Sequence, residues 1–314
     1  MKRVGCLLML VIILTQTAFI SHAETVTNEK EIAVLTESDL QEYFADSVLV
    51  GDSVALGYAN YAKANKDSIV GKMIFLTEGG FGASNAMKPL EQELNPTYKG
   101  KRQYIWDSIA ETGAKRVFLS YGINDLVPLN KRIYSQYEEV VNKILEKSPD
   151  IDINIVSITP VFSEGEYGRI NNEHIDEVNA KLKEIASEKG WGFLDVASKL
   201  KGEDGSLAAD YCSDGYVHLN KSTYPAVWNP VFEQFAEEDL SEDGYIFLKE
   251  EAKVILTTVS SELYAVPDAE SESLLTVPAD TEIISKGVTS NDMYLLDLGD
   301  GTDYYIKTEN AKVE

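Results

Sequence analysis

The feature that most constrains the fold is a strand, turn and helix pattern within residues 46–57. Its first part, Val48-Leu49-Val50, is a short apolar run rich in β-branched residues, which predicts a buried strand. Gly51-Asp52 interrupts this strand, and residues 53–65 carry apolar side chains at helical spacing. Ser53 is therefore expected in the first turn of a helix, where unpaired N–H groups can stabilise a negative charge. We interpret Ser53 as a candidate nucleophile, and a plain N-cap or turn role is the alternative.

Strand-like runs alternate with helical patterns along the next part of the chain. Strands are expected at 72–77, 116–121, 153–158 and 192–196, and helices at 39–44, 53–65, 133–145, 175–187 and 224–235. This alternation predicts an α/β fold with a mostly parallel sheet that is covered on both faces. Sites in such sheets form at the carboxyl ends of the strands. Ser53, the glycine cluster at 79–82 and Asn124 all follow strands, so three segments indicate one site.

A nucleophilic serine needs a base, and two histidines, His174 and His218, follow the apolar N-terminal segment. His218 is expected in a loop, with Asp214 four residues before it. Asp214 could accept a proton from one imidazole nitrogen and leave the other nitrogen free for Ser53. The alternative is a turn aspartate beside a surface histidine. His174 lies among polar residues at the start of a helix, which favours a solvated face over a metal site.

Donors for an oxyanion are expected from three places. Three N–H donors would together form an oxyanion hole: the backbone N–H of Ser53, the backbone N–H of Gly82, which no side chain covers, and the side-chain amide of Asn124. For the glycines alone, a plain turn is the competing interpretation. The stretch around Ser84, Gly82-Ala83-Ser84-Asn85-Ala86, is similar to the Gly-x-Ser-x-Gly nucleophile elbow but lacks the final glycine. We therefore do not interpret Ser84 as the nucleophile. Cys212 is interpreted as a small packed side chain rather than a nucleophile.

These segments resemble the SGNH (GDSL-type) hydrolase family over residues 46 to about 236. The resemblance rests on four ordered blocks: Gly51-Asp52-Ser53, Gly82 in Phe81-Gly82-Ala83, Gly122-Ile123-Asn124-Asp125, and Asp214 to His218. It implies a flavodoxin-like three-layer α/β/α fold with a five-stranded sheet. It also implies ester hydrolysis by Ser53, His218 and Asp214, with Ser53, Gly82 and Asn124 as oxyanion donors and with neither metal nor cofactor.

The last block departs from the family pattern. Three residues, 215–217, separate Asp214 from His218, where the family usually has two. If the extra residue is looped out, Asp214 keeps its role, and otherwise Asp210 is the fallback. The choice between Asp214 and Asp210 therefore stays open at the level of sequence.

The N-terminus has the form of a secretory signal peptide. Lys2 and Arg3 precede an apolar run, and Ser21-His22-Ala23 offers small residues at the cleavage positions, so residues 1–23 are expected to be removed. No later segment is apolar enough to span a membrane. The mature chain keeps one cysteine, which suits a secreted or cell-surface protein of a bacterium better than an animal secretory protein.

The domain organisation follows from these patterns. Residues 24–45 are expected to form an arm and a short helix, 46–236 the hydrolase domain, 237–251 an acidic linker and 252–314 a small all-β, barrel-like module. This module resembles bacterial Src-homology-3-like domains through Leu263-Tyr264-Ala265-Val266-Pro267 and Asp303-Tyr304-Tyr305-Ile306. Such domains often bind cell-wall peptides, so a cell-wall ligand is one expected partner.

Charge restricts the partners. The formal net charge is −24, and removal of Lys2 and Arg3 would make it −26 (−24 minus 2). This acidity disfavours nucleic acid and anionic membranes. We therefore expect a secreted serine esterase that removes small acyl groups, first of all O-acetyl, from a cell-wall or environmental polysaccharide. The alternatives are a lipase or thioesterase for longer acyl chains, a transferase with a similar triad, and a non-enzymatic wall-binding protein on a degenerate hydrolase scaffold.

Overall fold

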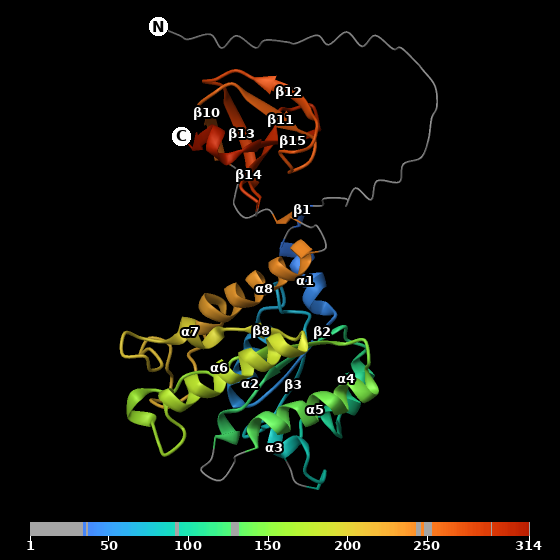
Figure 1. The fold of residues 1–314 in the computed structure, drawn as a ribbon, viewed down its shortest axis with the longest axis vertical. Helices are drawn as coiled ribbons and strands as arrows, with labels where there is room; N and C mark the ends of the chain where they lie inside the picture. The colour runs from blue at the N-terminus through green and yellow to red at the C-terminus, as the bar shows by residue number, and fades with distance from the viewer. Residues whose placement is uncertain are drawn as a thin grey trace. The chain divides into compact units, whose positions relative to one another are not determined.

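A parallel sheet of five strands forms the centre of the part of the chain that precedes the C-terminal module (Figure 1). In sheet order they are β3 (Ile74–Thr77), β2 (Ser47–Gly51), β6 (Arg116–Ser120), β7 (Asp152–Val156) and β8 (Gly192–Leu194). The α/β class and the five parallel strands expected from the sequence are confirmed. The strand β2 is completely buried, as its β-branched run predicts.

The structure is a computed structural model that describes residues 34–35, 37–91, 94–126, 132–242, 246–247, 253–289 and 291–313. The expected signal peptide and most of the N-terminal arm lie outside these residues. Within the described ranges, every helix is too short or too polar to cross a membrane.

Helices pack against the sheet, and Figure 1 shows two of them, α5 and α6, in front of it. The longer helices are α1 (Glu37–Ala45), α2 (Ser53–Ala64), α4 (Ile105–Thr112), α5 (Ile133–Lys147), α6 (Asn172–Lys189) and α8 (Asn229–Glu242). A single π-helical turn, Tyr224–Trp228, leads into α8. An aromatic cluster joins α1, β6 and α8 through Phe44, Phe118 and Phe232, whose ring centroids lie 5.1–6.1 Å apart.

Several element boundaries differ from the sequence analysis, and the expected strand 153–158, for example, is β7, which ends at Val156. The expected strand 192–196 ends at Leu194 because the Asp195 side chain accepts a hydrogen bond from the Ser198 N–H at 3.0 Å and starts α7 (Val196–Leu200). The expected helix 224–235 begins with the π-helical turn, and α8 continues to Glu242, into the stretch expected as a linker. Elements that the sequence analysis did not foresee include the helices α3 (Ala83–Ala86) and α4 and the β4–β5 ladder (Thr97–Tyr98 with Lys101–Arg102).

The C-terminal part is an antiparallel sheet of seven strands, which confirms the all-β expectation. In sheet order they are β12 (Ser273–Val277), β11 (Ser261–Tyr264), β15 (Asp303–Lys307), β14 (Met293–Asp297), β13 (Glu282–Val288), β10 (Lys253–Thr257) and β16 (Ala311–Val313). Both faces of β14 are apolar: Tyr294 and Leu296 belong to one buried cluster, and Met293 and Leu295 to another. A separate parallel pair joins β1 (Val34–Leu35) to β9 (Ile246–Phe247).

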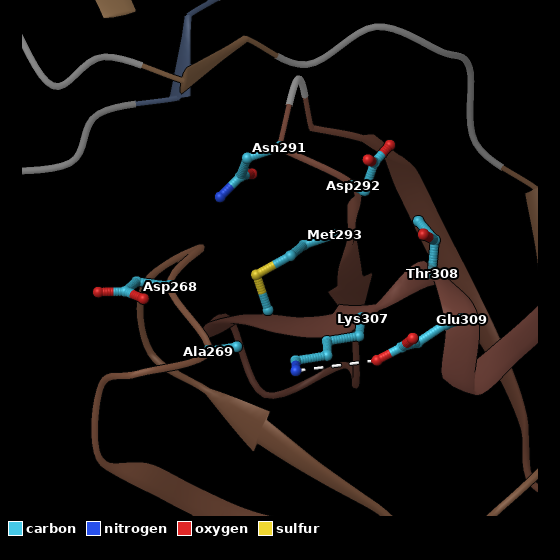
Figure 2. Close-up of a pocket in the computed structure, with 8 residues that line it drawn as sticks. All are labelled: Asp268, Ala269, Asn291, Asp292, Met293, Lys307, Thr308 and Glu309. Atoms are coloured by element: carbon cyan, nitrogen blue, oxygen red, sulfur yellow. Dashed lines mark ion pairs between the residues drawn. The ribbon is translucent and has the colours of Figure 1, made fainter. Parts of the chain in front are cut away.

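A hollow of about 370 Å³ opens on the module beside the second of these clusters (Figure 2). Met293 lies at its base, and Lys307 forms an ion pair with Glu309 at 3.8 Å on one side. Asp268 and Asp292 add two more carboxylates to its lining, so the hollow is mainly acidic.

Candidate active site

Ser53 is the first residue of α2, and Asp52 alone separates it from the buried strand β2. The Asp52 side chain caps this helix by accepting a hydrogen bond from the Val54 N–H at 2.9 Å. Gly51 is required by close packing, because a Cβ there would lie 2.2 Å from Ala55 Cβ and 2.5 Å from the Ser120 carbonyl oxygen. The strand can therefore turn sharply into the helix and present Ser53 at the carboxyl end of the sheet.

The structure brings Ser53, His218 and Asp214 together in a row. His218 Nε2 lies 3.0 Å from Ser53 Oγ, and His218 Nδ1 lies 2.5 Å from Asp214 Oδ2. Both distances are within hydrogen-bonding range. This is the arrangement in which an imidazole can take a proton from a serine hydroxyl while a carboxylate holds its other nitrogen.

Three residues separate Asp214 from His218, and this loop folds back around one carboxylate oxygen of Asp214. Asp214 Oδ1 accepts hydrogen bonds from the N–H groups of Tyr216, Val217 and His218 at 2.9, 3.1 and 3.2 Å. Gly215 has φ +69°, a conformation that favours glycine. The expected fallback, Asp210, instead offers its backbone carbonyl to the Asn220 side chain at 2.9 Å.

The same contacts set the ionisation of Asp214. Partial burial raises the pKa of this carboxyl, but the hydrogen bonds from the His218 side chain and from the Tyr216 and His218 N–H groups outweigh it. The attraction of the His218 charge adds to them, so the pKa of Asp214 lies below its ordinary value. Asp214 is thus held as the carboxylate that an orienting acid must be.

The other two expected oxyanion donors, Gly82 and Asn124, lie in the loops after β3 and β6. Asn124 uses one of its two side-chain N–H groups to bind the Phe81 carbonyl oxygen at 2.9 Å, which ties the loop after β6 to the loop after β3. Gly82 has extended backbone, and a Cβ there would lie 2.5 Å from Asp125 Oδ2. Gly122, with φ +137°, approaches Ile158 so closely that a Cβ would lie 2.6 Å from Ile158 Cδ1.

Asp125 is a residue of this site that the sequence analysis assigned no role. It is completely buried, and its two carboxylate oxygens accept hydrogen bonds from the N–H groups of Ala83 at 2.8 Å and Ser84 at 3.0 Å. Asn124 and Asp125 therefore form hydrogen bonds with the backbone on both sides of Gly82. The Gly-x-Asn-Asp motif was visible in the sequence, but its partners lie about forty positions earlier, so spacing could not reveal them.

Tyr224 is a second contributor that was missed. Its hydroxyl donates a hydrogen bond to the Val54 carbonyl oxygen at 3.0 Å, one residue after Ser53. The ring stacks on Tyr58 of α2 with centroids 5.5 Å apart. Gly57 makes this approach possible, because a Cβ at that position would lie 1.8 Å from the Tyr224 hydroxyl oxygen.

Three other candidate residues take no part in the contacts among Ser53, His218 and Asp214. Cys212 Sγ lies 3.8 Å from Asp214 Oδ1, so the thiol borders the acid rather than the serine. His174 Nδ1 faces Glu177 Oε2 at 3.4 Å on α6. Ser84 donates its backbone N–H to Asp125. Across the described residues, no three side chains of His, Cys, Asp or Glu gather closely enough to hold a metal ion.

The domain is similar to several solved protein structures. Solved structures that resemble it include a GDSL-like lipase from Bacteroides thetaiotaomicron VPI-5482, which is 16% identical, covers 62% of this chain and 88% of its own, and has a TM-score of 0.48. A lipase/acylhydrolase from Enterococcus faecalis is 13% identical, with 62% and 96% covered and a TM-score of 0.44. An acetyl xylan esterase is 13% identical, with 60% and 98% covered and a TM-score of 0.44.

A search of curated proteins gave no match. The model of the GDSL-like lipase/acylhydrolase family, by contrast, matches residues 49–226, which is more than half of the chain. The matched region contains Ser53, Gly82, Asn124, Asp214 and His218. The chain therefore belongs to the GDSL-like lipase/acylhydrolase family, a family of ester hydrolases.

Proposed function

We propose that this chain is a serine esterase that removes small acyl groups, first of all O-acetyl, from a cell-wall or environmental polysaccharide. The observation that carries the proposal is the position of the His218 imidazole, which contacts Ser53 Oγ at 3.0 Å and Asp214 Oδ2 at 2.5 Å. Ser53 lies at the start of α2, and Asp214 and His218 lie in a loop; Ser53 and His218 are 165 residues apart in the sequence. Such convergence of serine, base and acid is typical of nucleophilic acyl transfer.

In the first half of the reaction, Ser53 Oγ attacks the ester carbonyl carbon while His218 Nε2 takes the hydroxyl proton. Asp214 holds the Nδ1–H and stabilises the imidazolium that forms. The negative charge on the former carbonyl oxygen is stabilised by the N–H groups of Ser53 and Gly82 and by the free side-chain N–H of Asn124. The C–O bond to the alcohol then breaks, and the alcohol leaves with the proton from His218.

In the second half, water attacks the acyl group on Ser53 while His218 again accepts a proton. The tetrahedral species collapses, the bond to Ser53 Oγ breaks, and His218 returns its proton to that oxygen. The free acid is released, and the enzyme is restored. Both halves use the same donors, because the developing oxyanion occupies the same position each time.

The openness of the site supports a polymeric alcohol. The His218 side chain is 46% exposed and the Asp214 side chain 35% exposed. Because the leaving alcohol must reach His218, such exposure leaves room for a chain much larger than the acyl group. The expected export signal and the C-terminal module favour a glycan outside the cell. The acidic hollow of the module is our candidate for a cell-wall ligand without high negative charge.

The test compares substrates and variants of the mature chain. We expect hydrolysis of p-nitrophenyl acetate and of acetylated xylan or acetylated peptidoglycan, and much weaker hydrolysis of long-chain p-nitrophenyl esters. Ser53→Ala should lower kcat on the order of 10³-fold or more, because triad members act as a unit. Ser84→Ala is the matched control and should retain activity, and a fluorophosphonate should label Ser53.

Other outcomes would identify the alternatives. A label on Ser84, or near-full activity of Ser53→Ala, would contradict serine catalysis at this position. Preference for long acyl chains would indicate a lipase or thioesterase. Wall binding without hydrolysis of any ester would indicate a non-enzymatic binding protein.

A further inference from the structure

Tyr167 presents an aromatic ring to solvent. Its relative exposure is 81%, and it is the only aromatic residue among the exposed large hydrophobic residues in the described part of the chain. The next most exposed, Ile284, is at 56%. A tyrosine joins an apolar ring face to a polar hydroxyl, so a ring exposed to this degree is available to stack against a ligand.

The ring is carried by a rigid turn. Tyr167 and Ile170 exchange two backbone hydrogen bonds at 2.8 and 3.0 Å. Just before the ring, Glu166 Oε1 accepts hydrogen bonds from the Asn172 N–H at 2.9 Å and from its side chain at 2.8 Å. The buried Asn172 side chain in turn pairs with both backbone groups of Val161 at 2.9 Å. The backbone that carries the exposed ring is therefore held in place before any partner binds, which lowers the entropic cost of binding.

This turn adjoins the loop that carries the acid and base of the proposed triad. The Phe162 N–H donates a hydrogen bond to the Tyr216 carbonyl oxygen at 2.7 Å. Gly165 packs on Tyr216 so closely that a Cβ would lie 2.7 Å from the Tyr216 ring. Tyr216 itself donates its N–H to Asp214 at 2.9 Å. The turn also follows β7, so it lies at the same carboxyl edge of the sheet as Ser53.

The surroundings of the ring indicate which ligand would cover it. A hollow of about 400 Å³ is lined by Glu166, Tyr167, Gly168, Asn171 and Glu173. Tyr167 is its one large apolar side chain, and the others offer carboxylates, an amide and backbone. A long acyl chain would need continuous apolar contact, and a polyanion would be repelled by the two glutamates. A neutral sugar has both an apolar C–H face for the ring and hydroxyl groups for the polar rim.

We propose that Tyr167 and its hollow form a glycan subsite, in which the ring stacks on a neutral sugar unit next to the acylated one. This inference rests on the proposed esterase function and specifies how the polysaccharide is held. Glu173 would accept hydrogen bonds from sugar hydroxyls at the rim. The subsite would raise affinity for polymeric substrates and would leave the hydrolysis of small esters untouched.

The experiment uses the full mature chain and partly acetylated xylan. Tyr167→Ala should raise KM for this polymer about tenfold or more, the effect of losing one stacked ring. The kcat and KM for p-nitrophenyl acetate should not change. Tyr167→Trp, which keeps a stacking surface, should retain the low KM. Val259→Ala is the control, because it shortens an exposed apolar side chain (48% exposed) of the C-terminal module.

Binding measured without turnover separates this inference from the proposed function. Ser53→Ala should be retarded by unacetylated xylan in affinity electrophoresis, and Ser53→Ala with Tyr167→Ala should not. If the wild type hydrolyses no acetylated glycan but the retardation depends on Tyr167, the esterase proposal fails and the subsite stands. If Tyr167→Ala leaves both KM and retardation unchanged, or affects only long-chain esters, the glycan subsite is overturned.

Discussion

Two aspartates, Asp210 and Asp214, lie within reach of His218 along the chain, and only one of them contacts its imidazole. Asp214 Oδ2 lies 2.5 Å from His218 Nδ1, and Oδ1 is held by three backbone N–H groups. Asp214→Asn should lower kcat by up to about 10⁴-fold, because the imidazole would be held in the wrong tautomer. Asp210→Asn is the matched control and should keep most activity. Secondary structure by circular dichroism should be the same in both variants.

The opposite pattern would show that the loop uses Asp210 during turnover. Equal and mild losses in both variants would instead favour a serine–histidine dyad.

The lowered pKa of Asp214 adds a further expectation about the pH dependence of hydrolysis. Because the pKa of the Asp214 carboxyl lies below its ordinary value of 3.8, protonation of Asp214 should not lower kcat/KM until the pH falls below that value.

Asp52 gives a pH dependence of stability. Burial raises the pKa of this carboxyl from 3.8 to about 7, and nearby Asp125 adds to the shift, while the N–H groups of Val54 and Ala55 and the His218 charge oppose it. Between pH 4 and pH 7 the folded chain keeps a proton that the unfolded chain has released. The free energy of unfolding therefore decreases as the pH rises through this window.

Asp52→Asn removes this titration and keeps a side chain that can cap α2. Relative to this variant, the wild type should lose stability from pH 4 to pH 7, by at most about 4 kcal/mol. Urea unfolding at several pH values measures the difference. A difference that stays constant over this range would contradict the raised pKa.

At the scale of elements, the loops after β3 and β6 act as one unit. Asn124 binds the Phe81 carbonyl oxygen, and Asp125 binds the N–H groups of Ala83 and Ser84. Asp125→Asn replaces one acceptor by a donor facing an N–H group, so the Gly82 backbone should lose its fixed orientation. We expect kcat for p-nitrophenyl acetate to fall by up to about 10²-fold with little change in KM.

The control for this prediction is Asn124→Ala, which removes an oxyanion donor directly and should give a similar split between kcat and KM. Thermal unfolding should show whether Asp125→Asn remains folded at the assay temperature. Near-full kcat in a folded Asp125→Asn chain would mean that Asp125 only stabilises the loop and does not position Gly82.

Helix α2 is fixed by the close approach of Tyr224 to Gly57. A Cβ on Gly57 would lie 1.8 Å from the Tyr224 hydroxyl oxygen and 2.7 Å from Cζ. Gly57→Ala should therefore cost about 1–3 kcal/mol of stability through overpacking. Adding Tyr224→Phe should recover part of this loss, because the closest clashing atom is removed. A double-mutant cycle by urea unfolding measures the coupling.

Gly79→Ala is the matched control, because nothing lies within 4 Å of a Cβ at that position and its φ is ordinary. It should change stability only slightly. A loss at Gly79 equal to that at Gly57, or additive effects of Gly57→Ala and Tyr224→Phe, would contradict the proposed contact.

The helices and strands also show which parts of the fold sequence patterns can predict. The strands β2 and β6 and the helices α5 and α6 were predicted within a few residues because their apolar side chains repeat at strand or helix spacing. The four-residue helix α3 is too short for any periodicity. Helix α4 has Tyr104 as its N-cap residue, and the Tyr104 side chain makes no cap hydrogen bond, so the sequence offered no N-terminal signal. The contacts of Asp125 and Tyr224 join distant segments and depend on the tertiary fold.

At the scale of the whole molecule, the chain contains apolar cores that share no residue. The largest buried cluster includes residues from Leu40 to Ala236. In the C-terminal sheet, the smaller buried cluster includes residues from Tyr264 to Tyr305, and the larger one includes residues from Ile255 to Ile306. Each part thus has the buried apolar surface that an independently folding domain requires. The signal peptide, the secreted location and the module's ligand stay predictions.

A shortened chain of residues 24–242, which ends with α8, tests this division. It should be soluble, unfold in one cooperative transition, and hydrolyse p-nitrophenyl acetate at close to the full-length kcat, since Ser53, Asp214 and His218 all lie within it. It should also lose whatever binding to purified cell walls the full chain shows, because the acidic hollow around Met293 and Lys307 is absent. Sedimentation of each chain with cell walls measures that binding. A shortened chain that is insoluble, or that is folded but inactive on p-nitrophenyl acetate, would show that the C-terminal module completes the enzyme instead of serving as a separate binding domain.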